Sequence, residues 1–292
     1  MRVAVVQSGG CDEQDLAGNV ERLAELARTA AAPGADLVVL PELSTTPYFA
    51  GATYDAAYRS WAQPVPGPTT ERLAEVCREV DSAMAFGMLE VGDDGLLYNS
   101  LVFLDRSGAL VPGTLPDGRQ APAFRKLTAP TVVSQTLTVD EGAYFTPGPG
   151  PMVFDVDGTR YGALICYDRA FSEPWLANRA LGADVVVLAV SSLGWRESLF
   201  VDDLRLRAME VGVFVVAANR GGVEECGGRA TDYFGRSCVI APDGEVLAEA
   251  KPHTHPEVLH AELDLGRLDS ARRQWPVWTD RRPELYRFMY EH

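Results

Sequence analysis

The most informative stretch of the chain reads Tyr161-Gly-Ala-Leu-Ile-Cys-Tyr-Asp-Arg-Ala-Phe-Ser-Glu-Pro-Trp175. Its apolar half predicts a buried strand that ends at Cys166, and Ser172-Glu-Pro174 is typical of the start of a helix. Catalytic nucleophiles often occupy a strand end that faces a helix start, because nearby backbone N–H groups can stabilise negative charge. A lone cysteine is more often a packing residue, so the case for chemistry depends on other parts of the chain.

Two other segments contain residue types that a reactive thiol requires. The first is Ala35-Asp-Leu-Val-Val-Leu-Pro-Glu-Leu43, a second buried-strand pattern that ends in the carboxylate of Glu42. The second is Ala123-Phe-Arg-Lys-Leu127, a short strand-like piece that contains Lys126. Taken singly, Glu42 is typical of a solvated loop and Lys126 of surface charge. Taken with Cys166, they supply the base and the cation that thiol chemistry needs at neutral pH.

In the order Glu42, Lys126 and Cys166, the three segments resemble the Glu-Lys-Cys triad of the nitrilase superfamily of carbon–nitrogen hydrolases. The resemblance extends along nearly the whole chain. Further segments similar to the family are Arg2-Val-Ala-Val-Val-Gln7, Gly182-Ala-Asp-Val-Val-Val-Leu188, Arg207-Ala-Met-Glu210, Ala218-Asn-Arg-Gly221 and Gly235-Arg-Ser-Cys-Val-Ile-Ala-Pro-Asp-Gly244. Each piece alone is a weak signal, whereas the ordered set at family-like spacing is a strong one.

Strand and helix patterns alternate along the chain, which predicts an α/β fold. Strands are expected at Val3–Gln7, Asp36–Leu40, Ala83–Leu89, Asn99–Leu104, Val153–Val156, Tyr161–Ile165, Val185–Val190, Phe214–Ala218, Ser237–Ile240 and His260–Leu263. Helices are expected at Asn19–Ala32, Thr69–Val80, Glu173–Ala180 and Phe200–Glu210. Composition allows a doubly wound sheet. The resemblance implies instead a four-layer α-β-β-α sandwich, in which two sheets pack together with helices outside.

Length and composition predict one domain over residues 1–292. The chain has 292 residues with 47% hydrophobic content, which is enough for a substantial core. No linker or internal repeat divides it. Residues 271–292 form a tail rich in Arg, Pro and aromatic residues, which could cover a neighbouring subunit or fold back onto its own. The resemblance implies a homodimer or a higher homo-oligomer.

Charge and cysteine content limit the partners and the compartment. The 26 basic and 41 acidic residues give a net charge of −15, which disfavours nucleic acid and anionic membrane surfaces as partners. We find no apolar run of transmembrane length and no signal-peptide pattern. The five cysteines are scattered and form no CxxC pair, which argues against a disulfide framework and predicts a cytoplasmic protein.

The resemblance implies a hydrolytic mechanism that needs no metal or organic cofactor. Glu42 would be the general base that takes the proton from Cys166, and the thiolate would attack the carbon of a C–N bond. Lys126 and the backbone N–H of Tyr167 would stabilise the oxyanion. Ammonia or an amine would leave, and Glu42 would then activate the water that hydrolyses the thioester.

A second active-site carboxylate is implied by Asp140-Glu-Gly-Ala-Tyr-Phe-Thr-Pro-Gly148, which resembles the family segment containing a further glutamate. The resemblance places this carboxylate at Glu141, with Asp140 as the alternative register. It would hold Lys126 or the amide nitrogen of the substrate in position. An acidic pair on the surface is the other interpretation.

Candidate substrate contacts lie close to the motif segments. Arg169 follows Cys166 by three residues, and its guanidinium is suited to bidentate binding of a carboxylate. The alternative is a structural ion pair between Arg169 and Glu173. Aromatic residues that could line the pocket, or equally pack in the core, are Tyr48, Phe49, Tyr144 and Trp195.

The chain also departs from the family pattern at two places. Many members have a histidine shortly after the lysine, whereas Leu127-Thr128-Ala129-Pro130 follows Lys126 here. The usual Glu-Asn pair in a later helix reads Glu210-Val211. Neither change removes a triad residue, but both put membership of a particular subfamily in doubt.

Two classes of function remain open. The first is a cysteine-dependent amidase or N-carbamoyl amidohydrolase that acts on a small linear substrate; nitrile hydrolysis by the same triad ranks lower, because Cys166-Tyr-Asp-Arg169 looks amidase-like. The second is a non-catalytic binding subunit with the same fold. The presence of all three triad residue types favours the enzyme, and the specific substrate stays undetermined.

Overall fold

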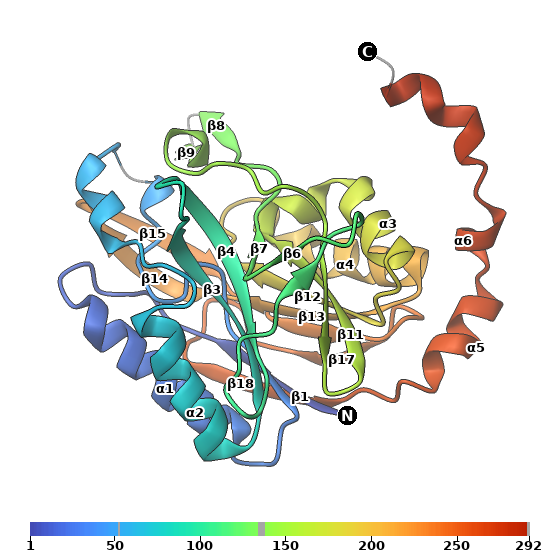
Figure 1. Ribbon diagram of the computed structural model, residues 1–292, viewed down its shortest axis with the longest axis horizontal. Helices are drawn as coiled ribbons and strands as arrows, with labels where there is room; N and C mark the ends of the chain where they lie inside the picture. Colours follow the sequence, from blue (N-terminus) through green and yellow to red (C-terminus); the bar gives the residue numbers. More distant parts are fainter. Residues whose placement is uncertain (52, 134–137, 291–292) are drawn as a thin grey trace.

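The computed structural model describes residues 1–51, 53–133 and 138–290, and two β-sheets form its centre (Figure 1). The first sheet has the strand order β18 (Glu257–Glu262), β1 (Arg2–Gln7), β2 (Leu37–Val39), β3 (Ala83–Val91), β4 (Leu97–Leu104) and β7 (Phe124–Arg125). The second has the order β17 (Val246–Glu249), β16 (Cys238–Ile240), β13 (Phe214–Asn219), β12 (Val185–Val190), β11 (Thr159–Ile165), β10 (Val153–Val156), β5 (Gly113–Thr114) and β6 (Gln120–Ala121).

The two sheets face each other across a dry apolar layer. Side chains from both sheets meet there, among them Val5 and Phe103 from the first and Phe154, Val187 and Phe214 from the second. All five are fully buried or nearly so, and the rings of Phe103 and Phe154 stack with centroids 4.2 Å apart. Consecutive buried positions in β12 and β13 reflect a sheet that is covered on both faces.

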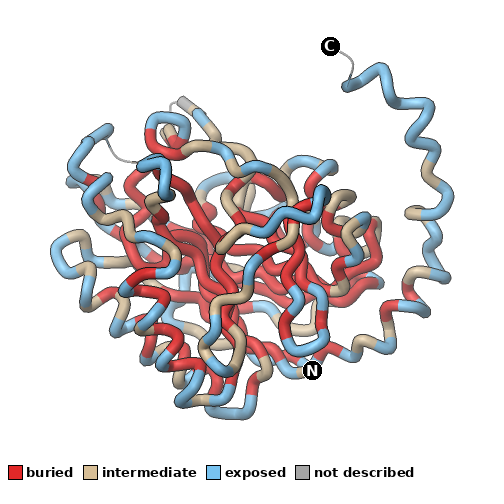
Figure 2. The backbone as a smooth tube through the Cα atoms, viewed as in Figure 1, coloured by how far each residue is buried: buried red, intermediate tan, exposed pale blue. Residues whose placement is uncertain are grey.

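Helices cover the outer face of each sheet. The pair α1 (Leu16–Ala31) and α2 (Pro68–Val80) buries apolar side chains against the first sheet. The pair α3 (Ser172–Ala180) and α4 (Glu197–Val211) covers the second. Figure 2 shows the buried residues concentrated in the sheets and the exposed ones on the outer helix faces and loops. The layer order is therefore α-β-β-α, which confirms the predicted four-layer sandwich.

Local chemistry sets the helix ends. The side chain of Asp15 accepts a hydrogen bond from the backbone N–H of Gly18 at 2.8 Å, so α1 begins at Leu16, a few residues before the predicted Asn19. Pro68 begins α2, as suits a residue without a backbone N–H. Helix α4 ends at Val211, because the next residue, Gly212, has φ of +64° and takes the left-handed conformation that favours glycine.

Several short elements were absent from the sequence-based prediction. They are the hairpin β14 (Gly221–Cys226) and β15 (Arg229–Phe234), the hairpin β8 (Thr131–Val133) and β9 (Thr138–Asp140), the strands β5 and β6, and the helices α5 (Arg267–Gln274) and α6 (Val277–Asp280). Polar and charged residues in β14 and β15 hide their strand character. The turn Gly227-Gly228 between them is nevertheless a hairpin signal, with φ of +56° and +73°.

The C-terminal segment leaves the layers after β18. Helices α5 and α6 and the 3₁₀ turns at Pro283–Tyr290 run along the outside as an arm (Figure 1), and Figure 2 shows the arm largely exposed. Large exposed apolar side chains on it are Trp275, Leu285, Tyr286, Phe288, Met289 and Tyr290. The last two residues of the predicted tail, 291–292, lie outside the described residues. No helix in the described ranges is both long and apolar enough to cross a bilayer.

Candidate active site

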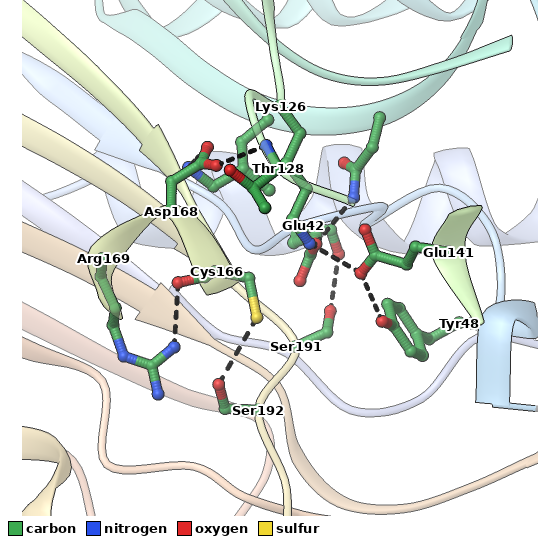
Figure 3. Close-up of polar contacts among 12 residues, drawn as sticks. Glu42, Tyr48, Lys126, Thr128, Glu141, Cys166, Asp168, Arg169, Ser191 and Ser192 are labelled. Carbon is green, nitrogen blue, oxygen red and sulfur yellow. Dashed lines mark hydrogen bonds and ion pairs between the residues drawn. The ribbon is translucent and has the colours of Figure 1, made fainter. Parts of the chain in front are cut away.

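The candidate site lies where strands of both sheets end. Strands β1, β2 and β3 run parallel in the first sheet, as do β11, β12 and β13 in the second. Glu42 follows β2, Cys166 follows β11, and Lys126 comes directly after β7. Figure 3 shows their side chains converging, together with Glu141 from the 3₁₀ turn that follows β9. The topology thus brings together four residues that are far apart in the sequence.

Sharp backbone turns present two of these residues. Cys166 has φ of +44°, a left-handed conformation that is strained for a residue with a Cβ. It opens the 3₁₀ turn Cys166–Ala170, which leads into α3. Leu43, next to Glu42, has φ of +46°. A Cβ at Gly87 of β3 would lie 2.6 Å from the Cα of Glu42, so this close approach requires glycine.

Lys126 lies between two buried carboxylates. Its Nζ is 2.9 Å from Oε1 of Glu42 and 2.6 Å from Oε1 of Glu141. The hydroxyl of Tyr48 donates to the same oxygen of Glu141 at 2.5 Å, and Nδ2 of Asn99 donates to Oε1 of Glu42 at 2.7 Å. The positive charge and both carboxylates are therefore held in fixed positions away from water.

The electrostatics of this cluster favour a charged lysine. Burial by itself would lower the pKa of Lys126, but the carboxylates of Glu141 and Glu42 outweigh it and raise the pKa above the usual value. Burial, with Glu42 adding to it, raises the pKa of Glu141 to about 7, although Lys126 opposes the shift. One lysine cannot fully compensate two carboxylates, and Glu141 is the one that gains a proton near neutral pH.

Cys166 lies beside this cluster, at the bottom of a pocket. Its Sγ is 3.6 Å from Oγ of Ser192, and the side chain is partly exposed. Burial and the nearby carboxylate of Glu42 raise the pKa of the thiol, although Lys126 and Arg169 lower it. Since the resting thiol is therefore protonated at neutral pH, it needs a base. The second oxygen of Glu42, Oε2, is buried and has no hydrogen-bond partner among the described residues.

Asp168 joins the lysine segment to the cysteine turn. Its carboxylate accepts hydrogen bonds from the backbone N–H groups of Leu127 at 3.2 Å, Thr128 at 3.0 Å and Ile165 at 3.2 Å. Burial raises the pKa of Asp168 to about 6, against the opposing effect of Lys126 and these N–H groups. This role of Asp168 was not predicted, because an aspartate after a strand is ordinarily a solvated loop residue.

A pocket of about 280 Å³ opens above Cys166. Predicted site residues that line it are Tyr48, Glu141, Cys166, Tyr167, Arg169 and Trp195. The residues it adds include Val139, Ser191, Ser192 and Arg196, which the sequence reasoning did not single out. Trp195 stands at the rim with 72% of its surface exposed. The size suits a small linear molecule.

Arg169 is buried and lacks a carboxylate partner in the described part of the chain. Its Nη1 donates to the carbonyl of Cys166 at 3.0 Å, and its Nε has no hydrogen-bond partner among the described residues. The guanidinium carbon lies 5.0 Å from the ring centroid of Phe200. Glu173, the alternative partner, instead accepts from the hydroxyl of Tyr290 at 3.4 Å. The alternative interpretation, an ion pair between Arg169 and Glu173, is therefore not observed.

Tyr144 does not reach this pocket. It is buried in an aromatic cluster, 4.9 Å between ring centroids from both Phe49 and Tyr54. Its hydroxyl accepts a hydrogen bond from the backbone N–H of Asp55 at 2.9 Å. The 3₁₀ turn at Glu141–Ala143 points Glu141 inward and leaves Tyr144 facing the cluster. Of the two interpretations left open for Tyr144 and Phe49, pocket lining and core packing, the structure therefore favours core packing.

The family model for carbon–nitrogen hydrolase matches residues 2–273, and the chain belongs to this family. Among curated relatives, omega-amidase NIT2 of Homo sapiens is 31% identical over 275 residues, which cover 92% of this chain and 91% of the relative. The N-carbamoylputrescine amidase of Solanum lycopersicum is 30% identical over 300 residues, which cover 98% and 94%.

Solved structures share the same architecture. A carbon–nitrogen hydrolase from Helicobacter pylori G27 superposes with a TM-score of 0.87 at 24% identity, covering 100% of this chain and 99% of the other. An amidase variant from Nesterenkonia sp. AN1 superposes with a TM-score of 0.75 at 25% identity, covering 98% and 95%. That structure has the acetamide moiety of fluoroacetamide added covalently at its active-site cysteine.

Proposed function

We propose that this carbon–nitrogen hydrolase cleaves a small linear amide or N-carbamoyl compound through a thioester on Cys166. The observation that carries the proposal is the ammonium of Lys126 between the buried carboxylates of Glu42 and Glu141, next to a thiol that opens into a pocket. A scaffold has no need to bury two carboxylates and a lysine at strand ends, since burying charge is costly. A catalytic role explains why these charged groups are buried together.

In the acylation half, Glu42 takes the proton of the Cys166 thiol as Sγ attacks the carbonyl carbon. Negative charge develops on the carbonyl oxygen, and Lys126 with the backbone N–H of Tyr167 stabilises it. Protonated Glu42 then gives its proton to the departing nitrogen. Ammonia leaves, the C–N bond is broken, and the acyl group remains on Cys166 as a thioester.

In the deacylation half, Glu42 is again a carboxylate and takes a proton from water. The hydroxide that forms attacks the thioester carbon, and the same oxyanion donors stabilise the second tetrahedral intermediate. Collapse of the intermediate releases the carboxylic or carbamic acid, and the proton held by Glu42 returns to the sulfur. Glu141 keeps Lys126 in place throughout, assisted by the hydroxyl of Tyr48.

Within the amide class, we propose a substrate that also has a carboxylate. Arg169 lines the pocket as a buried cation whose Nε has no hydrogen-bond partner among the described residues, and Arg196 lines the same pocket. A guanidinium without a protein carboxylate is suited to a carboxylate of the substrate. One relative is named omega-amidase, so ω-amides with a carboxylate and N-carbamoyl amino acids are the first substrates to test. N-carbamoylputrescine, for which another relative is named, has an amine and no carboxylate.

We also propose a homodimer or higher homo-oligomer in the cytoplasm. The arm from Trp275 to Tyr290 presents apolar side chains to solvent, and such a surface commonly covers a neighbouring subunit. The five cysteines are free, as suits a reducing compartment. The proposed nucleophile, base and oxyanion-stabilising groups all come from one subunit.

The test is release of ammonia from a panel of ω-amides, N-carbamoyl amino acids, neutral aliphatic amides and nitriles. Two matched variants accompany the wild type. Cys166→Ala removes the proposed nucleophile, and Cys11→Ala removes a partly buried thiol whose Sγ donates to the carbonyl of Ser44 at 3.3 Å.

We expect turnover of one class of amide or carbamoyl compound, abolished by Cys166→Ala and retained by Cys11→Ala. Turnover of nitriles alone would redirect the assignment to nitrile hydrolysis. If no substrate is turned over and Cys166 reacts with iodoacetamide no faster than Cys11 does, the protein is a binding subunit rather than a hydrolase.

A further inference from the structure

Arg220 is a fully buried arginine that directly follows β13, and one of its nitrogens donates hydrogen bonds to three backbone carbonyl groups. Nη2 donates to the carbonyl oxygens of Glu42 at 3.2 Å, Leu43 at 2.6 Å and Thr46 at 2.7 Å. The segment 42–46 therefore curls around the guanidinium, which explains how the left-handed conformation of Leu43 is maintained. This contact fixes the backbone that presents the proposed base.

The same guanidinium also reaches the nucleophile's side of the site. Nε of Arg220 donates to Oγ of Ser191 at 3.0 Å, and that hydroxyl donates to the carbonyl of Glu42 at 3.0 Å. The next residue, Ser192, has its Oγ 3.6 Å from Sγ of Cys166. Figure 3 shows Ser191 directed toward Glu42 and Ser192 directed toward Cys166. One side chain thus links the segments that flank both the base and the thiol.

The counterion of Arg220 extends the network to the second carboxylate. Glu224 in β14 forms an ion pair with Nη1 of Arg220, and both side chains are buried. Oε1 of Glu224 accepts from the backbone N–H of Tyr48 at 2.8 Å and from the hydroxyl of Tyr233 at 3.1 Å. The hydroxyl of Tyr48 in turn donates to Glu141. A single buried ion pair is therefore connected to Glu42, to Glu141 and to the thiol.

From these contacts we propose that Arg220, neutralised by Glu224, is a positioning residue that aligns Glu42 with the thiol of Cys166. The proposal rests on the proposed function, in which Glu42 is the base. Arg220 touches no reacting atom and acts through the backbone of Glu42 and through Ser191. The role requires arginine rather than lysine, because only a planar fork of five N–H donors can bind several acceptors at fixed angles.

Two variants separate alignment from mere stability. Arg220→Lys keeps the positive charge opposite Glu224 but loses the planar set of five N–H donors. Ser191→Ala removes only the hydroxyl that bridges Arg220 and Glu42. If Arg220→Lys does not fold, Ser191→Ala alone tests the proposal. Arg272→Lys is the matched control, since Arg272 also binds a carboxylate and carbonyl groups, those of Gly212 at 2.9 Å and Ala183 at 3.2 Å.

The readout is the rate at which iodoacetamide alkylates Cys166 between pH 5.5 and 10, followed by mass spectrometry of the peptide that contains it. This rate needs no substrate and reports how well the base removes the thiol proton. Thermal midpoints of all variants are recorded beside it. Steady-state kcat and KM are added with any amide that the wild-type protein hydrolyses.

At pH 7 we expect the alkylation rate to fall about tenfold in Arg220→Lys and about threefold in Ser191→Ala, a fraction of what a general base contributes. The difference in alkylation rate between each variant and the wild type should disappear toward pH 10, because hydroxide there removes the thiol proton without help from Glu42. We expect kcat to fall in parallel, with KM within about twofold of the wild type. Arg272→Lys should alkylate at the wild-type rate at every pH.

Two outcomes overturn the proposal. One is wild-type alkylation in a folded Ser191→Ala or Arg220→Lys protein at every pH. The other is a deficit of constant size from pH 5.5 to 10, which indicates general loosening of the fold rather than misalignment of the base. If wild-type Cys166 itself reacts no faster than Cys11, the proposed function fails, and the positioning role fails with it.

Discussion

Lys126 and its two carboxylates are the centre of the site at the scale of single residues. The ammonium is 2.9 Å from Glu42 and 2.6 Å from Glu141, and all three side chains are buried. At this separation and low polarity the groups interact strongly, so the protonation state of each one depends on the others. The site residues are therefore best tested by changes that alter one charge at a time.

Glu42→Gln should abolish the proposed base while keeping the hydrogen bond from Asn99. We expect kcat to fall by about 10²- to 10⁴-fold, the usual contribution of a general base, with KM changed only a few-fold. Steady-state ammonia release measures both constants. Glu79→Gln, which breaks only a surface pair with Arg28, is the control. Activity of Glu42→Gln within tenfold of the wild type would remove Glu42 from the mechanism.

The raised pKa of Glu141 predicts that activity depends on pH. Its pKa is raised to about 7, so the carboxylate is protonated below that pH and charged above it. Protonation leaves Glu42 as the one charged partner of Lys126, which strengthens that ion pair and holds Glu42 away from the thiol proton. We therefore expect kcat/KM to rise with pH through about 7, and this inflection should disappear in Glu141→Gln. An unchanged inflection in that variant would assign it to another group.

Arg169→Gln tests the proposed carboxylate contact. Losing a charge-assisted bidentate contact should raise KM for an ω-amide or N-carbamoyl acid by about 10- to 100-fold. A neutral amide of the same length should show little change in KM, because it makes no such contact. Comparison of the two substrates in one preparation removes any effect of partial unfolding. An equal rise in KM for both would mean that Arg169 is structural.

At the scale of elements, Asp168 connects β11, the 3₁₀ turn and the lysine segment. Asp168→Ala leaves three backbone N–H groups without their acceptor, that of Ile165 buried and those of Leu127 and Thr128 partly buried, and each such loss costs about 1 kcal/mol. We expect the thermal midpoint to fall by about 6 °C or more, as measured by calorimetry. Asp155→Ala, which breaks an exposed pair with Arg160, should change it little. Equal shifts in both variants would contradict the bridging role.

Much of the framework could be predicted from the sequence, because buried strands and amphipathic helices have strong local patterns. Strands β2 and β11 were expected with Glu42 and Cys166 at their ends, and the structure has them there. The four-layer order came from the resemblance rather than from pattern, since a doubly wound sheet has similar periodicities. Short strands such as β5 and β6 contain two residues each and leave no periodic signal.

The supporting residues of the site were harder to predict, and the reason is physical. Arg220 and Glu224 are charged residues of a type that is ordinarily exposed, and only the assembled fold shows that they are buried as a pair. Ser191 and Ser192 follow a buried strand, where small polar residues are common in loops. Pocket lining and core packing both stayed open for Tyr144, because the sequence cannot show to which side a 3₁₀ turn directs an aromatic ring.

In the molecule as a whole, the arm beyond α5 lies outside the four layers and exposes apolar side chains to solvent. Replacing Leu285 and Phe288, which are 54% and 62% exposed, by serine should shift the molecular mass in solution toward the monomer. Light scattering at several concentrations measures this shift. The thermal midpoint of the core should change little. Leu96→Ser, at an exposed hairpin turn, should leave the mass unchanged, and a wild-type protein that is already monomeric would contradict the proposal.

The most direct test of the thioester mechanism is hydroxylamine partitioning during turnover of an amide that the protein hydrolyses. Hydroxylamine attacks a thioester to give a hydroxamate and the free thiol, so it competes with water only if an acyl-enzyme forms. We expect hydroxamate to appear at the expense of the acid, and Cys166→Ala to make neither product. Ammonia release with no hydroxamate at saturating hydroxylamine, together with activity retained in Cys166→Ala, would contradict it.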